Sequence, residues 1–151
     1  MPLLLVGHSM GAAACALALR DGVAARGAVL LAPPVDPAVY VDRFNRFFRL
    51  RASVAAGVHR RLETRYGVRM RDLRLTERAA STPLLVFHDR RDIRVSIRDG
   101  LAVARSWPAA ELVVTRGLGH HKILRAPSVI RRSVRFARSL LRETLVRRCA
   151  V

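Results

Sequence analysis

The amino-acid sequence predicts an α/β fold built on a parallel sheet, and three observations carry this prediction. Several short runs are continuously apolar, without the alternation of a half-buried strand, which is typical of strands buried on both faces of a parallel sheet. Stretches with helical spacing separate these runs, as in parallel β-α-β crossovers. The chain has 151 residues, of which 51% are apolar, so residues 1–151 fit a single domain with a sizeable core.

The first strand and the first helix adjoin a turn that contains two glycines. Residues 3–6 are Leu-Leu-Leu-Val and form the first predicted strand, and residues 12–19 read as an alanine-rich helix. The five residues between them, Gly7-His8-Ser9-Met10-Gly11, match the pattern G-x-S-x-G, which in this context is typical of a nucleophile elbow. Strand and helix lie so close at such a turn that we expect a Cβ at either glycine to collide. Ser9 is then held at the apex in a strained conformation with its Oγ exposed.

The region between residues 36 and 78 differs from the strands around it. The second predicted strand covers residues 27–32, and beyond it arginines alternate with apolar residues at helical spacing. We interpret residues 36–78 as a helical cap insertion of two helices, the second ended by Gly67. In this interpretation three aromatic residues face an acyl group of the substrate, namely Phe44, Phe47 and Phe48. Two alternatives remain open: surface helices that pack these aromatic residues into the core, and a basic amphipathic surface for anionic membranes.

The second half of the chain restores the strand pattern twice, which brings the predicted sheet to about four parallel strands. The predicted elements are a strand at residues 82–88, a polar loop at 89–95, a helix at 96–107, a strand at 111–115, a loop at 117–121 and a closing helix at 128–148. Ser96 is the expected cap of the 96–107 helix and Pro108 its stop. The closing helix has an apolar face formed by Ile130, Val134, Ala137 and Leu141.

Three polar side chains follow three of the predicted strands. Ser9, Asp92 and His120 lie in the loops after the first, third and fourth strands. The carboxyl ends of parallel strands meet at one edge of the sheet, where ligands of open α/β sheets bind. A serine hydroxyl becomes a good nucleophile when a neutral imidazole accepts its proton, and a carboxylate orients the imidazole and stabilises its protonated form. The three residues, in this chain order, therefore predict a catalytic triad.

Three segments resemble the active-site segments of α/β-hydrolase fold proteins of the serine esterase type: Gly7-His8-Ser9-Met10-Gly11, His88-Asp89-Arg90-Arg91-Asp92-Ile93-Arg94-Val95 and Gly119-His120. The resemblance implies that Ser9 is the nucleophile, Asp92 the acid and His120 the base. It also implies hydrolysis of a small-molecule carboxylic ester or thioester through an acyl-enzyme intermediate, without a cofactor. The backbone N–H of Met10, the residue after the nucleophile, is expected in the oxyanion hole.

Neighbouring residues offer alternatives for two of these roles. Asp89 stands where the family often has glycine; it is the alternative acid, although a hydrogen bond within the loop is its expected role. His121 is the alternative to His120, the histidine that directly follows glycine. We expect His8 to pack beside the turn rather than to ionise. The histidines lack the spacing of a zinc site, and no metal is expected.

The sequence departs from the family in the position of the nucleophile strand. This strand lies in the middle of the family's sheet, whereas here it starts at Leu3, so the chain resembles the C-terminal portion of such a protein. We therefore expect residues 3–6 to form an exposed apolar edge that self-associates or pairs with a partner. The loop that supplies the second N–H of the oxyanion hole lies in the missing N-terminal half. Two explanations stay open: a portion of a longer hydrolase, or a half-domain that a partner completes. The alternative function is an impaired hydrolase fragment that acts through protein-protein association.

The charge balance is strongly basic, with 28 Lys and Arg against 11 Asp and Glu and a net charge of +17. Such a charge attracts polyanions and anionic membranes, which gives a further alternative function. The basic residues are scattered along the chain without interleaved aromatic residues, so no nucleic-acid partner is expected. No apolar run is long enough to cross a bilayer, and residues 1–19 lack the basic start of a secretory signal. These features favour a cytoplasmic location.

Overall fold

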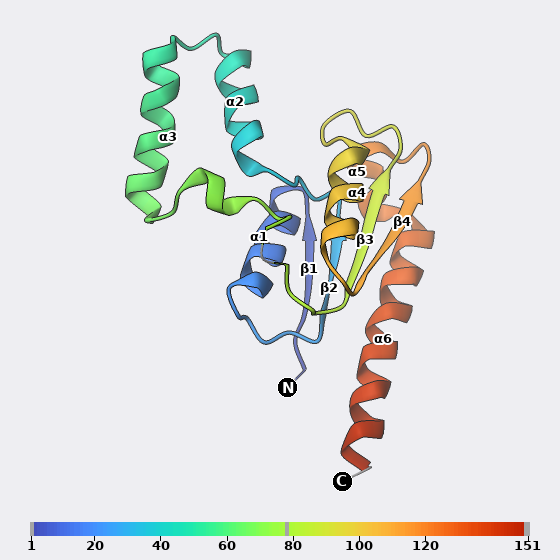
Figure 1. The fold of residues 1–151 in the computed structure, drawn as a ribbon. Helices are drawn as coiled ribbons and strands as arrows, with labels where there is room; N and C mark the ends of the chain where they lie inside the picture. The colour runs from blue at the N-terminus through green and yellow to red at the C-terminus, as the bar shows by residue number, and fades with distance from the viewer. Residues whose placement is uncertain (1, 78, 150–151) are drawn as a thin grey trace.

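A computed structural model describes residues 2–77 and 79–149 of the chain, with a parallel sheet at its centre (Figure 1). The four strands follow the order β1-β2-β3-β4, which confirms the predicted α/β class and a partial α/β-hydrolase fold. Their bounds are β1 (Leu4–His8), β2 (Gly27–Leu31), β3 (Leu84–Asp89) and β4 (Ala110–Thr115). All pairs are parallel, so the carboxyl ends of the strands lie at the same edge of the sheet.

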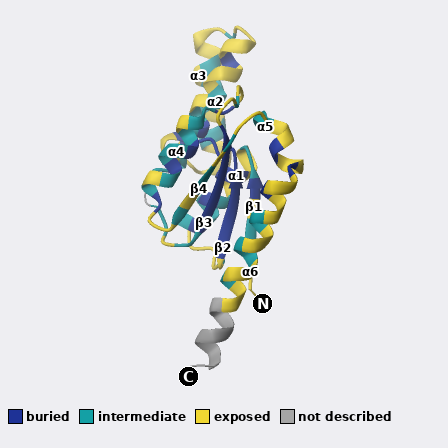
Figure 2. Cartoon of the chain, turned by 90° about the vertical axis from the view of Figure 1, so that its right-hand side faces the viewer, coloured by how far each residue is buried: buried dark blue, intermediate teal, exposed yellow. Residues whose placement is uncertain are grey.

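Helices cover both faces of the sheet. The helices and 3-10 turns are α1 (Met10–Arg20), α2 (Pro37–Phe47), α3 (Ala52–Tyr66), η1 (Met70–Leu73), α4 (Ile97–Ser106), α5 (Gly119–Lys122), η2 (Ile123–Arg125) and α6 (Pro127–Cys149). One core cluster joins α1 and α4 to the sheet, and a second joins η2 and α6 to its other face. The central strands β2 and β3 are buried along their whole length (Figure 2), which explains their uninterrupted apolar sequences.

Helices α2 and α3 extend beyond the carboxyl ends of the strands (Figure 1). The carboxylate of Asp36 caps α2 by accepting a hydrogen bond from the N–H of Ala38 at 3.0 Å. As the sequence predicts, α3 ends at Gly67, whose left-handed conformation favours glycine. None of the residues of α3 is buried. The helical pair therefore stands largely outside the core, in the position where a cap over the strand ends would lie.

Helix α6 packs on the sheet through Val129 and Phe136. Val129 is buried, and Phe136 packs beside it against β2 and β3. On the apolar face identified from the sequence, Ile130, Val134 and Leu141 are 49%, 43% and 44% exposed. Apolar residues thus lie on two sides of the helix, and their spacing alone does not say which side meets the sheet. Although α6 is long, neither it nor any other helix in the described part of the chain is apolar enough to cross a membrane.

The two edge strands of the sheet differ in charge. β1 pairs only with β2 within the described chain, and Val6 on this strand is 63% exposed, as the sequence predicts for an apolar edge. β4, at the opposite edge, carries Glu111, which forms an ion pair with Arg132 of α6. Charged residues hinder the pairing of an edge strand with another chain, and β1 contains no Asp, Glu, Lys or Arg. The edge of β1 is thus the less protected of the two.

The turn between β1 and α1 brings two stretches of backbone into contact at Gly7. A Cβ at Gly7 would lie 2.4 Å from the carbonyl oxygen of Gly11 and 2.7 Å from the Cα of Ala12, so only glycine fits. The same expectation is wrong for Gly11, because a Cβ there meets no atom within 4 Å. Gly11 belongs to the first turn of α1, where a side chain would extend into open space. One glycine of the motif is therefore required by packing, and the other is not.

This difference predicts opposite effects of alanine at the two positions. Gly7→Ala is expected to lower the free energy of unfolding by about 2–3 kcal/mol, because the backbone around the new methyl group must move. Gly11→Ala is the matched control and is expected to leave stability unchanged or raise it by up to about 1 kcal/mol, since alanine favours helix. Urea unfolding followed by circular dichroism measures both. Equal effects of the two substitutions would contradict the close approach at Gly7.

Candidate active site

Ser9 lies at the carboxyl end of β1, in the turn that leads into α1. Its φ of 53° and ψ of −125° are rare for a residue with a side chain and indicate strain of about 1–3 kcal/mol. The N–H of Ser9 donates to the carbonyl of Leu31 at 2.9 Å, and its own carbonyl accepts from the N–H of Ala12 at 2.9 Å. Met10 is the first residue of α1, and the first N–H groups of a helix find no acceptor within it. The elbow thus combines a strained serine with the start of a helix.

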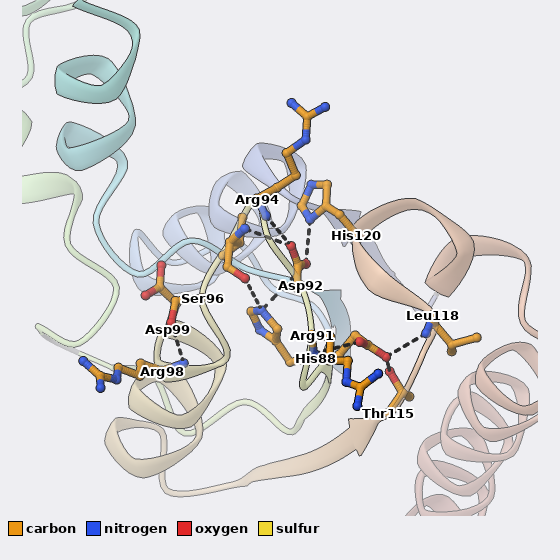
Figure 3. A network of polar contacts seen from close by, with 12 residues as sticks. His88, Arg91, Asp92, Arg94, Ser96, Arg98, Asp99, Thr115, Leu118 and His120 are labelled. Carbon is orange, nitrogen blue, oxygen red and sulfur yellow. Dashed lines mark hydrogen bonds and ion pairs between the residues drawn. The ribbon is translucent and has the colours of Figure 1, made fainter. Parts of the chain in front are cut away.

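Asp92 and His120 are joined by a hydrogen bond at the carboxyl ends of β3 and β4 (Figure 3). His120 Nδ1 lies 2.7 Å from Asp92 Oδ2, with the aspartate side chain fully buried and the imidazole 8% exposed. The other carboxylate oxygen of Asp92 accepts from the N–H groups of Arg94 at 2.8 Å and Val95 at 2.9 Å. These bonds fix the carboxylate, and the carboxylate in turn fixes the imidazole. The pairing is the one expected of the acid and the base in the sequence prediction.

Ser9 and His120 line the same cavity, whose volume is about 440 Å³. The other residues that line it are Tyr40, Arg43, Ile93, Arg94, Val95 and His121. The structure therefore brings together the three predicted site residues, with Asp92 behind the ring of His120. Four separate segments of the chain contribute walls: the elbow, helix α2, the loop after β3 and the loop after β4.

Three aromatic residues predicted to face the substrate do not line this cavity. Phe44, Phe47 and Phe48 are 54%, 80% and 56% exposed, and their rings contact one another near the end of α2. The residues of α2 that line the cavity are Tyr40 and Arg43 instead. Helical spacing identified α2 but gave no signal for the face of it that meets the site. Sequence reasoning therefore missed both of these residues.

His8, the residue before Ser9, packs beneath the base. Its Nε2 donates to the carbonyl of His120 at 2.8 Å, and the two ring centroids are 4.6 Å apart. Burial lowers the pKa of His8 below 6.5, and the neighbouring imidazoles of His120 and His121 lower it further against the opposing effect of the backbone hydrogen bond. His8 thus supports the backbone at His120 as a neutral group. His121 contacts both rings but has no hydrogen bond to Asp92.

Asp89 is fully buried at the end of β3 and binds the two loops that carry Asp92 and His120. Its carboxylate accepts hydrogen bonds from the N–H of Arg91, the hydroxyl of Thr115 and the N–H of Leu118, each at 2.9 Å. Burial alone would raise the pKa of this carboxyl, but the hydrogen bonds of Leu118, Arg91 and Thr115 outweigh it and lower the pKa below 3.8. The geometry gives Asp89 the role expected of it, a hydrogen bond within the loop.

His88 is a further buried histidine next to Asp92 that sequence reasoning left without a role. Its Nε2 donates to the carbonyl of Val95 at 3.0 Å and lies 3.9 Å from Asp92 Oδ2 (Figure 3). A Cβ at Gly100 of α4 would lie 2.5 Å from the Nδ1 of His88, so the ring packs directly on the backbone of the helix. His88 therefore holds the far end of the loop that positions Asp92. Across the described residues, no group of His, Cys, Asp or Glu side chains is arranged to hold a metal ion.

Comparisons with known proteins bear on the fold. No protein-family model and no curated protein matches the sequence. Among solved structures, BpoC from Mycobacterium tuberculosis H37Rv, assigned as a non-heme bromoperoxidase, is similar with a TM-score of 0.61 at 18% identity over 92% of this chain. MGS-MChE2, an α/β-hydrolase enzyme from a lagoon-sediment metagenome, gives 0.57 at 16% identity over 89%. The esterase Pf2001 of Pyrococcus furiosus gives 0.58 at 19% identity over 93%.

The similarity extends over most of this chain but only part of the other proteins. The chain spans 68% of BpoC, 59% of MGS-MChE2 and 52% of Pf2001. At these identities the comparisons show the fold, a part of the α/β-hydrolase fold, and the site must be judged from its own geometry.

The hydrogen bonds of Asp89 predict a pH-dependent contribution to stability. The pKa of Asp89 in the folded protein is below the ordinary 3.8. Its ionised carboxylate therefore stabilises the folded state fully above pH 3.8, and this contribution to the free energy of unfolding is lost as the pH falls below that value. Asp89→Asn is expected to lower the free energy of unfolding by about 3 kcal/mol at neutral pH, since an amide cannot accept all three bonds. Urea unfolding at neutral pH and at several values below 4 measures the difference from the natural chain.

The expected difference in the free energy of unfolding between Asp89→Asn and the natural chain narrows at lower pH, because the natural Asp89 is then protonated and uncharged, like asparagine. Asp21→Asn removes the same charge from an exposed carboxylate and serves as the control, with an expected change below about 1 kcal/mol. A difference between Asp89→Asn and the natural chain that stays constant down to the acid transition would contradict this account.

Proposed function

We propose that this chain is a serine hydrolase that cleaves carboxylic esters or thioesters through an acyl-enzyme intermediate. The observation that carries the proposal is the buried hydrogen bond of 2.7 Å between His120 and Asp92 beside a cavity that also holds the strained Ser9. The esterase among the structural neighbours supports the same class of chemistry. The roles proposed are nucleophile for Ser9, base for His120 and acid for Asp92.

In the first half of the reaction, Ser9 Oγ attacks the carbonyl carbon of the ester. The proton of the hydroxyl passes to Nε2 of His120, whose Nδ1–H stays bonded to the carboxylate of Asp92 and stabilises the positive imidazolium. The negative charge that develops on the carbonyl oxygen is stabilised by the backbone N–H of Met10. Collapse of the tetrahedral intermediate breaks the bond to the leaving group, which takes the proton from His120 as an alcohol or thiol.

In the second half, water replaces the leaving group. His120 accepts a proton from the water, and the resulting hydroxide attacks the acyl carbon bound to Ser9. The acid product leaves, and the proton returns to Ser9 Oγ. Every step is a proton transfer or an acyl transfer, so the reaction balances with the ester, one water molecule and the residues named.

The rate depends on how completely the oxyanion is bound. Each N–H donor of an oxyanion hole contributes about 10²- to 10³-fold to turnover. Met10 is the proposed donor among the residues of this chain, and we propose that its N–H makes a contribution of this size.

The exposed edge of β1 supports a second proposal, in which two copies of the chain pair through this strand. Val6 on β1 and Leu3 before it are 63% and 44% exposed, and the strand carries no Asp, Glu, Lys or Arg to oppose pairing. The opposite edge has Glu111 in an ion pair with Arg132, which hinders the same event there. Association of this kind would serve as the function of a chain with impaired catalysis.

The triad predicts the behaviour of the chain toward a serine-directed fluorophosphonate and toward p-nitrophenyl butyrate. The natural chain is expected to be labelled at Ser9, and Ser9→Ala to remove both labelling and hydrolysis. Asp92→Asn is expected to lower kcat by about 10³- to 10⁴-fold, because the imidazole loses the group that fixes its orientation. Ser53→Ala, on the exposed start of α3, is the control and keeps full labelling. Labelling that persists in Ser9→Ala would rule out the proposed nucleophile.

The edge predicts the oligomeric state. Light scattering after size-exclusion chromatography is expected to find a dimer whose fraction rises with protein concentration. Val6→Lys is expected to shift the chain to monomer, because a charge at the edge must be desolvated to pair. Val114→Lys places the same charge on β4, where Val114 is 47% exposed, and is expected to change nothing. A natural chain that is monomeric at all concentrations would overturn this second proposal.

A further inference from the structure

The cavity that Ser9 lines also has basic residues in its lining. Of the residues that line the cavity, Arg43 on α2 and Arg94 on the loop after β3 carry a positive charge, and none is Asp or Glu. Asp92 lies behind His120, where its carboxylate is buried and already bonded to the imidazole. An uncharged acyl chain would leave both guanidinium groups facing solvent. The lining therefore favours a substrate that carries its own negative charge.

Arg43 is held in place by groups on both sides of the cavity. Its Nη1 donates to the carbonyl of Arg94 at 3.0 Å, and its guanidinium lies 5.0 Å from the ring centre of Tyr40. The hydroxyl of Tyr40 donates to Asp99 Oδ2 on α4 at 3.0 Å. Burial and then the negative charge of Asp99 raise the pKa of Tyr40, so the hydroxyl keeps its proton. The chain of contacts from α4 through α2 to the catalytic loop fixes the guanidinium before any substrate arrives.

The charge of Arg43 has no counter-ion in the described part of the chain. Its one hydrogen bond goes to a neutral carbonyl, and its ring contact is to a neutral phenol. The guanidinium of Arg94 likewise forms no ion pair among the described residues. Its side chain extends away from the loop (Figure 3). A planar guanidinium with free N–H groups is well suited to bind a carboxylate. Two such groups at one cavity make the site receptive to an anion.

From this arrangement we infer that the cavity takes an ester whose acyl group ends in a carboxylate, with Arg43 as the specificity-determining residue that binds the carboxylate and Arg94 beside it. The inference rests on the serine hydrolase activity proposed above and specifies its substrate class. The carboxylate of a dicarboxylic acid monoester would lie against α2 while its ester carbon lies at Ser9. The released products would be a free dicarboxylate and an alcohol or thiol.

The test compares p-nitrophenyl valerate with the mono-p-nitrophenyl ester of glutarate, whose acyl chains have five carbons each and end in a methyl group and a carboxylate. Rates measured without protein are subtracted, because the glutarate carboxylate attacks its own ester in solution. The natural chain is expected to hydrolyse the glutarate ester with a kcat/KM about fivefold higher, which is the contribution of one exposed charge pair. The preference is expected to shrink as salt is added, because the arginines are exposed. Arg43→Gln is expected to remove the preference, and Arg43→Lys to retain part of it.

A control variant separates the cavity from the overall positive charge of the protein. Arg105→Gln removes one exposed charge from α4, outside the cavity, and is expected to keep the full preference for the glutarate ester. Equal loss of preference in Arg105→Gln and Arg43→Gln would overturn the inference, since the net charge would then be the cause. Measurable hydrolysis of both esters by the natural chain with equal kcat/KM would overturn the inference as well.

A binding measurement distinguishes this inference from the activity on which it rests. Ser9→Ala is titrated with the mono-p-nitrophenyl ester of glutarate by calorimetry, with and without Arg43→Gln. Binding that depends on Arg43 supports the anion site even where the natural chain hydrolyses neither ester. The missing hydrolysis would then count only against the proposed hydrolase function. Hydrolysis of the neutral ester together with no Arg43-dependent binding would support the hydrolase and exclude the anion site.

Discussion

The geometry of the site depends on a buried carboxylate that takes no part in the proposed chemistry. Asp89 ends β3 and accepts hydrogen bonds from the loop that carries Asp92 and from the loop that carries His120. It also accepts a hydrogen bond from the hydroxyl of Thr115 at the end of β4, so it links the ends of two neighbouring strands. A buried charge is stable only when such bonds satisfy it, and here the bonds that satisfy it also set the distance between the acid and the base.

The nucleophile is positioned by a different constraint, the contact between strand and helix at Gly7. No side chain fits between the two backbones there, and the chain turns so sharply that Ser9 adopts a strained conformation. Strain of this kind persists where the surrounding structure determines it, and here Leu31 and Ala12 bind the backbone of Ser9 from both sides. The serine and the imidazole are therefore placed by two separate parts of the sheet, which meet only because the strands are parallel.

Charged and apolar side chains occupy different parts of the surface. Helix α2 contributes Arg43, which is stacked on Tyr40 and bonded to the carbonyl of Arg94 in the loop after β3. The phenylalanines at its end contact one another at the surface. The similarity to larger hydrolases covers part of their length, and the edge strand β1 and the outer face of α6 both present apolar side chains. The positive charge at the cavity and the apolar surface at the sheet edge are thus separate features. The charge favours binding of an anion, and the apolar edge favours association with another chain.

The sequence by itself determined the fold class and predicted which three polar side chains lie after the ends of the strands. Uninterrupted apolar runs occur where strands are buried on both faces, and the serine, aspartate and histidine follow such runs, so a parallel sheet must bring them to one edge. The tertiary structure decided which faces of the helices meet their neighbours. Periodicity predicts the helices that carry Val129 and Ile130, and Arg43 and Phe44. Only packing against the sheet and the loops decides that Val129 rather than Ile130 is buried, and that Arg43 rather than Phe44 lines the cavity. For the same reason Gly7 is required and Gly11 is free, because close contact depends on the path of the backbone after the turn.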